Sequence, residues 1–322
     1  MRVLSAGRGI VLLLAFAAAL LVASGLLPPY WVGLLTEALI WALFAMSLDI
    51  LLGHTGLPSL GHAAFYGMGA YAAAVWFLHG SRDFWTCAVV GVASAAVLAL
   101  VYGLLALRTI GVYFLMITLA LAQVLWGIAY SWRSVTNGDD GLRGIKRAGI
   151  EFLSLKLGET QDYFVFVLAI FVLAAAALFV IQRSPFGYVL RGIRDSAERM
   201  EALGYNTWLY KLCAFTLSGA LSGLAGVLFV FNNNYVSPEV LSVTVSAEAM
   251  LMIILGGAGT FFGPLIGAFA IVLLSYGVSS FTEHWSFVLG AIYVAVIVFA
   301  PDGLAGMVAR RRGKAVAQGR PK

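Results

Sequence analysis

Long uncharged segments dominate this sequence and limit the environments in which the chain can fold. Of its 322 residues, 61% are hydrophobic and only 11% are charged, whereas a soluble domain carries roughly a quarter charged residues. The uncharged runs cover residues 9–36, 50–81, 84–107, 109–132, 163–182, 212–238, 249–282 and 284–301. Because a membrane helix needs about 20 apolar residues, we expect an all-α integral membrane protein.

These runs predict about ten transmembrane helices in one domain that covers residues 1–307. The expected spans are residues 10–27, 31–52, 58–78, 84–107, 111–131, 163–182, 211–232, 246–257, 262–280 and 285–300. Because Arg2 and Arg8 precede the first apolar run, a cleaved signal peptide is an alternative interpretation of the N-terminus. An uncleaved first helix is simpler, since many spans follow it.

The distribution of basic residues predicts that both termini lie in the cytoplasm. Cytoplasmic loops are enriched in Lys and Arg, and this orientation places fourteen of the 20 basic residues inside. The inside then holds the loop at residues 183–210 and the basic tail at 308–322, and the loop at 132–162 lies outside. The positive net charge therefore requires no nucleic-acid partner.

Acidic groups and glycine-rich junctions mark the interior of the expected spans. Glu37 is two turns into the second span, where a carboxylate is costly and either lines a pathway or is paired. Asp49 lies nearer the cytoplasmic end, so we expect a structural role for it. The junctions at residues 52–62 and 255–264 share the pattern Leu-Gly-x-x-Gly, which is a weak internal repeat of the kind that transporters contain.

We therefore assign the substrate pathway to a set of residues on the second span and the two junctions. The set is Glu37, Ser59, Gly61, His62, Phe65, Gly256, Gly257 and Gly259. Close helix packing is the alternative role for the glycines. No second histidine or cysteine lies at ligand spacing from His62, so we expect no metal site.

An amphipathic helix is predicted from Ser184 to Gly204, outside the membrane. Its apolar residues recur at spacings of three and four: Leu190, Ile193, Ala197 and Met200. Its mixed charges favour docking on a protein over lying on the lipid bilayer. The chain contains no phosphate-binding loop, so we expect it to bind no cofactor, and any ATP must be used by a partner subunit.

Several motifs together resemble the branched-chain amino-acid permease family of ABC importers, and in particular its LivM-type subunit. They are Ser59-Leu60-Gly61-His62-Ala63-Ala64-Phe65, Gly138-Asp139-Asp140-Gly141-Leu142, Ser184-Pro185-Phe186-Gly187, Ser222-Gly223-Leu224-Ala225-Gly226 and Gly256-Gly257-x-Gly259-Thr260. The resemblance runs in collinear order from about residue 40 to residue 307.

The resemblance implies a bacterial inner-membrane importer of leucine, isoleucine and valine. Its partners would be a LivH-type permease, two cytoplasmic ATPase subunits and a periplasmic or lipid-anchored binding protein. It places ATPase coupling at Arg191, Arg194, Asp195, Glu198, Glu201, Ala202 and Gly204. It places the dock for the binding protein at Gly138, Asp139, Asp140 and Gly141.

Three other functions are consistent with parts of the sequence. A urea or short-chain amide permease of the same superfamily has similar motifs, although Gly138-Asp139-Asp140-Gly141-Leu142 favours the amino-acid branch. An ion-coupled secondary transporter would need more acidic residues at mid-membrane than Glu37. An intramembrane enzyme would need a nucleophile and a base, and the sequence offers no such arrangement.

Overall fold

Helices form most of the structure in this computed structural model, which describes residues 2–147, 159–279 and 290. The long helices are α1 (Arg2–Leu26), α2 (Pro29–Asp49), α3 (Ala63–His79), α4 (Phe84–Ala106), α5 (Val112–Ser131), α7 (Thr160–Arg183), α10 (Thr207–Asn233), α11 (Val243–Gly256) and α12 (Gly263–Ser279). The shorter elements are the π-helix η1 (Ile50–Thr55), α6 (Arg133–Thr136), η2 (Gly138–Asp140), β1 (Leu142–Arg143), α8 (Pro185–Asp195), α9 (Ala197–Ala202), β2 (Tyr235–Val236) and η4 (Pro238–Leu241).

The long helices occur where the uncharged runs predict them. Each of the first nine expected spans coincides with one long helix, and the tenth, at residues 285–300, lies outside the described residues. Among the described residues, six helical segments are long and apolar enough to cross a membrane: Gly9–Leu26, Pro29–Thr55, Phe84–Ala106, Val112–Ser131, Thr160–Arg183 and Thr207–Asn233. α3, α11 and α12 are shorter apolar helices with 17, 14 and 17 described residues, against the roughly 20 residues of a typical membrane span. The structure thus confirms an all-α bundle with membrane-spanning helices, and the count of ten spans stays a prediction.

The third expected span is wrong at its start. Residues 58–62 are not helical, and α3 begins at Ala63. Gly56 ends the π-helix with a left-handed φ of 72°, a conformation that favours glycine. The hydroxyl of Ser246 in α11 accepts a hydrogen bond of 2.8 Å from the backbone N–H of Ala63, which satisfies one of the unpaired donors at the start of α3.

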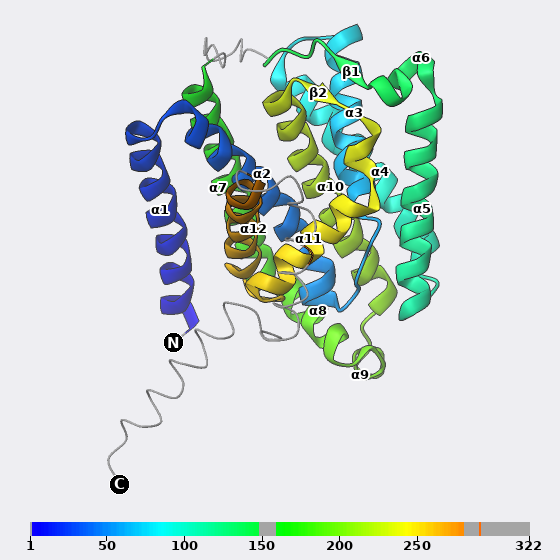
Figure 1. Ribbon diagram of the computed structural model, residues 1–322. Helices are drawn as coiled ribbons and strands as arrows, with labels where there is room; N and C mark the ends of the chain where they lie inside the picture. The colour runs from blue at the N-terminus through cyan, green and yellow to red at the C-terminus, as the bar shows by residue number, and fades with distance from the viewer. Residues whose placement is uncertain (1, 148–158, 280–289, 291–322) are drawn as a thin grey trace, which may run out of the picture.

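Helix α10 runs through the centre of the bundle and packs on α2, α3 and α4 (Figure 1). A Cβ atom at Gly226 of α10 would collide with the backbone carbonyl of Tyr66 in α3. Similarly, a Cβ at Gly69 of α3 would collide with the backbone of Gly223. Small residues allow membrane helices to approach closely where apolar burial gives no advantage over lipid. The glycines of α3 and α10 therefore fix the spacing at the centre of the bundle.

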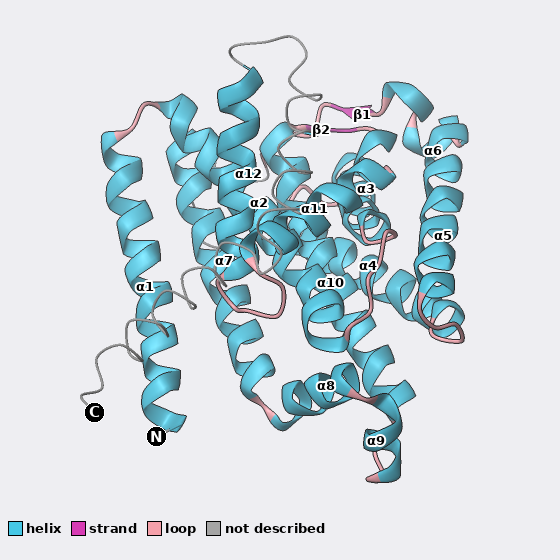
Figure 2. Ribbon diagram, turned by 60° about the horizontal axis from the view of Figure 1, so that its bottom comes forward, coloured by secondary structure: helices cyan, strands magenta, loops and turns pink. Residues whose placement is uncertain are grey.

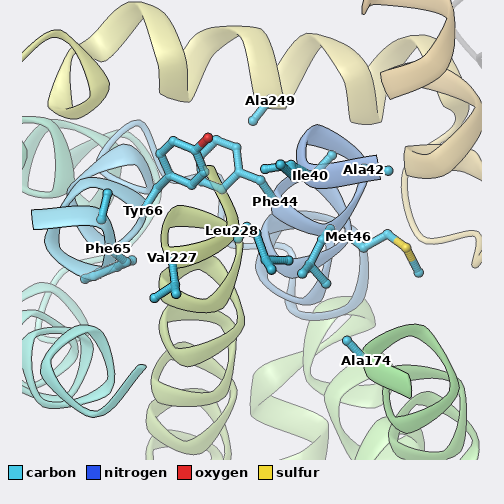
Figure 3. Close-up of a cluster of buried hydrophobic side chains, with 14 of the residues drawn as sticks. Ile40, Ala42, Phe44, Met46, Phe65, Tyr66, Ala174, Val227, Leu228 and Ala249 are labelled. Atoms are coloured by element: carbon cyan, nitrogen blue, oxygen red, sulfur yellow. The ribbon is translucent and has the colours of Figure 1, made fainter. Parts of the chain in front are cut away.

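Aromatic and aliphatic side chains fill the space between these helices. Figure 3 shows Phe44 of α2, Tyr66 of α3 and Leu228 of α10 pointing into one cluster, and all three are buried. The rings of Phe44 and Tyr66 have their centroids 4.6 Å apart. The hydroxyl of Tyr163 donates a hydrogen bond of 2.6 Å to the carbonyl of Leu228, so α7 is tied to the same centre.

The outer helices present apolar side chains away from the bundle. α1 packs on α7 at one edge, and α5 lies at the opposite edge (Figure 1). Val11 and Leu12 of α1 and Val124 and Ile128 of α5 are exposed. Because such side chains are costly in water and compatible with lipid tails, their exposure agrees with a membrane-embedded bundle.

The helix connections gather at two ends of the bundle, which we call the α8 end and the β1 end. The α8 end carries α8, α9 and the start of the chain, and the β1 end carries α6, β1 and β2 (Figure 1). β1 pairs antiparallel with β2, with Leu142 opposite Val236. This short strand pair was not predicted, and it ties the loop after α5 to the loop after α10.

The amphipathic helix expected over residues 184–204 is two helices. Ser196 has an extended backbone, with φ −167° and ψ 105°. Its hydroxyl accepts a hydrogen bond from the N–H of Arg199 and so caps α9. α8 buries Gly187, Val189, Leu190 and Ile193, whereas α9 buries no residue. Figure 2 shows both helices lying beyond the ends of the long helices.

We expect Gly226→Leu to destabilise the bundle, because the new side chain would have to displace the backbone of α3. Overpacking of this kind costs about 1–3 kcal/mol. The measurement is the unfolding temperature of the purified protein in detergent. Gly127→Leu on α5 is the matched control, since nothing lies within 4 Å of a Cβ at Gly127. Equal unfolding temperatures for the two variants would contradict this packing.

Candidate functional site

The two glycine-rich junctions meet at the α8 end of the bundle. The backbone N–H of Gly259, after α11, donates a hydrogen bond of 2.9 Å to the Oδ1 atom of Asp49, at the end of α2. A Cβ on Gly53 would collide with this same carboxylate and with the backbone of Gly259. Two segments about two hundred residues apart in the sequence are therefore in direct contact, and only glycine fits between them.

Asp49 is the buried charge at this contact. Its side chain is 1% exposed, and the ring nitrogen Nδ1 of His54 lies 3.5 Å from its Oδ2 atom. The same ring nitrogen lies 3.2 Å from the carbonyl oxygen of Asp49. A buried carboxylate is stable only when its oxygens have partners. Oδ1 is paired with the N–H of Gly259, whereas Oδ2 has no hydrogen bond among the described residues and only His54 beside it. The structural role expected for Asp49 stays a prediction.

Arg194 links α8 to both junctions. Its guanidinium donates a hydrogen bond to the carbonyl of Gly53. Arg194 also lies close to Gly259 and Gly56. A Cβ atom added to Gly259 would be 2.9 Å from the Nη1 atom of Arg194, and one added to Gly56 would be 2.9 Å from its Cγ atom. Any movement of α8 must therefore break these contacts or carry the ends of α2 and α11 with it.

The other residues assigned to ATPase coupling make internal contacts, form the outward surface of this segment, or do both. Arg191 donates hydrogen bonds to the carbonyls of Gln182, at 2.9 Å, and Gly187, at 3.3 Å, so it holds the corner between α7 and α8. Glu201 accepts a hydrogen bond from the hydroxyl of Thr207 at the start of α10. Glu201 is nevertheless exposed, and it forms the outward surface of this segment together with Asp195, Glu198, Ala202 and Gly204.

Several residues assigned to the pathway lie in helix packing rather than in a cavity. His62 is fully buried, and its Nε2 atom lies 2.9 Å from the hydroxyl of Ser47. Its ring also stacks on Phe44, with centroids 5.5 Å apart. Ser59 and Phe65 are buried as well, and a Cβ at Gly61 would collide with the backbone of Thr118.

The pathway glycines after α11 belong to the contact between the junctions. A Cβ at Gly256 would collide with the backbone of Gly263 at the start of α12. Gly257 and Gly259 have φ angles of 111° and 74°, and together they turn the chain from α11 into α12. The structure thus places Gly256, Gly257 and Gly259 near Asp49 and apart from Glu37.

Glu37 lines a cavity of about 290 Å³, on the half of α2 nearer the β1 end. The hydroxyl of Tyr276 in α12 donates a hydrogen bond of 2.6 Å to its Oε2 atom. The cavity is lined by Glu37, Trp41, Glu248, Met252, Ile271, Val272, Ser275 and Tyr276. Glu248 was not predicted as a pathway residue, although it is an acidic residue inside the expected span 246–257, the same signal that indicated Glu37.

The residues assigned to the binding-protein dock form an ordered corner at the β1 end. Gly138 and Gly141 have φ angles of 62° and 66°, and Tyr235 donates a hydrogen bond of 3.2 Å to the carbonyl of Asp140. The side chains of Asp139 and Asp140 are exposed. The corner therefore presents two carboxylates on a backbone that β2 holds in place.

We expect Gly53→Ala to destabilise the protein, because its Cβ would displace the Asp49 carboxylate from the Gly259 N–H. A hydrogen bond to a charged group contributes about 1.5–3 kcal/mol. The readout is again the unfolding temperature in detergent. Gly33→Ala on the same helix is the control, since nothing lies within 4 Å of a Cβ there. A Gly53→Ala protein as stable as the Gly33→Ala protein would show that the junctions do not need this close contact.

Comparison with known proteins places the chain among permeases. The family "Branched-chain amino acid transport system / permease component" matches residues 30–297. The high-affinity branched-chain amino acid transport permease LivM of Escherichia coli is 28% identical over 297 residues, which cover 86% of this chain and 70% of that protein. A probable LivH permease of Methanocaldococcus jannaschii is 25% identical over 286 residues, which cover 82% and 88% of the two chains. No solved structure matches the chain. The chain therefore belongs to the permease family of branched-chain amino-acid transport systems.

Proposed function

We propose that this chain is the LivM-type permease subunit of an ATP-driven importer of leucine, isoleucine and valine in the bacterial inner membrane. With a LivH-type permease it forms the translocation pathway, two cytoplasmic ATPase subunits hydrolyse ATP, and a binding protein delivers the amino acid. Two observations support this proposal. The chain is similar to permeases named LivM and LivH, and six of its described helical segments can span a membrane.

The observation that carries this proposal is the contact of Arg194 with both glycine-rich junctions. α8 and α9 lie outside the long helices and expose Asp195 and Glu198, which suits them to dock on a partner protein. Arg194 on the same segment holds the carbonyl of Gly53. A displacement of α8 by the ATPases would therefore be passed to the ends of α2 and α11.

The charges at the α8 end support its assignment to the cytoplasm. The connections at this end carry Arg108, Arg183, Arg191, Arg194, Arg199 and Lys211, and basic residues are enriched in cytoplasmic loops. The β1 end then faces outward, and the exposed Asp139 and Asp140 become available to the binding protein. The amino acid is released into the pathway at the end of the bundle nearer Glu37.

In this mechanism the permease supplies a two-state helix packing rather than bond chemistry. Closure of the ATPases on ATP moves α8, and the contact among Arg194, Gly53 and Gly259 transfers the movement to α2 and α11. A helix pair that has two stable packings responds to such a small shift as a switch.

The direct test is co-expression of this chain with the partner permease, the two ATPases and the binding protein encoded beside it. We expect the subunits to co-purify and, in proteoliposomes, to take up radiolabelled leucine only when ATP and the binding protein are present. Uptake of urea or acetamide in place of leucine would assign the chain to an amide importer. Uptake of leucine without ATPase subunits would contradict the proposal.

We expect Arg194→Glu to uncouple ATP hydrolysis from transport, because the reversed charge repels the carbonyl of Gly53. ATP hydrolysis by the reconstituted complex should continue while leucine uptake falls at least about tenfold, the effect of losing a charge-assisted hydrogen bond. Arg108→Glu, an exposed arginine between α4 and α5, is the matched control. Normal uptake by Arg194→Glu would count against a role for this contact in coupling.

A further inference from the structure

Two cavities near the β1 end of the bundle have one lining residue in common, a glutamate. The outer cavity, of about 350 Å³, is lined by Phe229, Tyr235, Ser237, Glu239, Val240, Ser242, Thr244, Val245 and Glu248. The inner cavity, of about 290 Å³, is the one that Glu37 lines. Glu248 belongs to both linings, so its side chain borders both cavities. Carboxylates of Glu239, Glu248 and Glu37 then follow one another from the loop after β2 into the bundle.

No basic side chain lines either cavity among the described residues. Glu37 and Glu248 are both half-buried, and both line the inner cavity. Glu37 accepts a hydrogen bond from Tyr276, whereas Glu248 has no hydrogen bond within the described part of the chain. Two carboxylates in a membrane interior without a cationic partner are costly. A cationic group between them would remove that cost.

An unpaired hydroxyl lies beside the inner cavity. Tyr66 is 1% exposed, and its hydroxyl has no hydrogen-bond partner among the described residues. Its ring stacks on Trp41 of the cavity wall, with centroids 6.2 Å apart. Figure 3 shows the hydroxyl pointing toward α11 at Ala249, the neighbour of Glu248. Buried polar groups in folded proteins are almost always paired, and this hydroxyl leaves a donor without a partner behind the wall of the cavity.

The rest of the inner wall is apolar. Met252 of α11 and Ile271 and Val272 of α12 are buried and face the same space. Its volume is near the lower end of the roughly 300–1,000 Å³ of small-molecule sites. The carboxylates on one side of the cavity suit the α-ammonium group of an apolar amino acid, and the aliphatic side chains on the other side suit its side chain.

We propose that the inner cavity is a transit site for the substrate amino acid, with the α-ammonium group held between Glu37 and Glu248. The aliphatic side chain lies against Met252, Ile271 and Val272, and Glu239 draws the ammonium group inward from the outer cavity. This inference rests on the proposed function, which names the amino acid but not the residues that receive it.

The first experiment measures ATP-dependent uptake of leucine by the complete reconstituted complex. Glu248→Gln and Glu37→Gln should each lower uptake about tenfold, the effect of losing one charge-assisted contact, and ATP hydrolysis should continue. Glu248→Asp keeps the charge and should retain most of the uptake. Glu159→Gln removes an exposed carboxylate at the start of α7 and should leave uptake unchanged.

The second experiment does not depend on transport or on the glutamine variants. A cysteine is introduced by Ser275→Cys, with Cys213→Ser removing the exposed native thiol, and the complex is treated with a thiol reagent. Leucine should protect the new cysteine, whereas 4-methylpentanoate, which lacks the ammonium group, should not.

The outcomes separate this inference from the proposed function. If the unmodified complex imports no leucine, the proposed function is wrong. If it imports leucine and both glutamine variants match Glu159→Gln, only the transit site is wrong. Equal loss in Glu248→Asp and Glu248→Gln, or equal protection by leucine and 4-methylpentanoate, would also overturn the transit site.

Discussion

The carboxylate of Asp49 holds together the two places where the helical backbone of this bundle is interrupted. At each interruption the chain loses helical hydrogen bonds, and an unpaired backbone group away from water costs several kcal/mol. Asp49 accepts the N–H of Gly259, and Arg194 donates to the carbonyl of Gly53. The breaks after α2 and α11 therefore stabilise each other, and α8 stabilises both. All three segments meet in the contact among Asp49, Gly259 and Arg194.

The helices that meet at this contact also carry the acidic cavity. Glu37 and Asp49 both lie on α2, twelve residues or about 18 Å apart along the helix axis. Glu248 and Gly256 both lie on α11, eight residues or about 12 Å apart. In the mechanism that we propose, a shift imposed at Arg194 reaches both cavity carboxylates through α2 and α11. The cavity and α8 would then change together in one rearrangement.

The centre of the bundle provides the rigid frame for such a movement. α10 is in backbone contact with α3, at positions where glycine alone fits, and Tyr163 ties α7 to it. Interfaces packed on backbone atoms leave little space for gradual deformation. Of the residues assigned to the pathway, Ser59, Gly61, His62 and Phe65 belong to this frame, and their role in transport remains a prediction.

The sequence by itself determined the membrane environment and the place of nine helices, because hydrophobic length and charge position are properties of each segment alone. It also identified both glycine-rich junctions, Glu37 and the segment that holds Arg194. It did not predict the break between α8 and α9 at Ser196. The apolar spacing continues across this residue, and only its extended backbone interrupts the helix.

Only the tertiary structure decided which of these features meet. Asp49 and Gly259 are paired, and Glu37 lies with Glu248 and Tyr276, because α2, α11 and α12 pack side by side. No hydrophobic period or residue spacing encodes contacts between segments two hundred residues apart. Which helices pair depends on how well their surfaces fit together, and these surfaces meet only in the folded bundle.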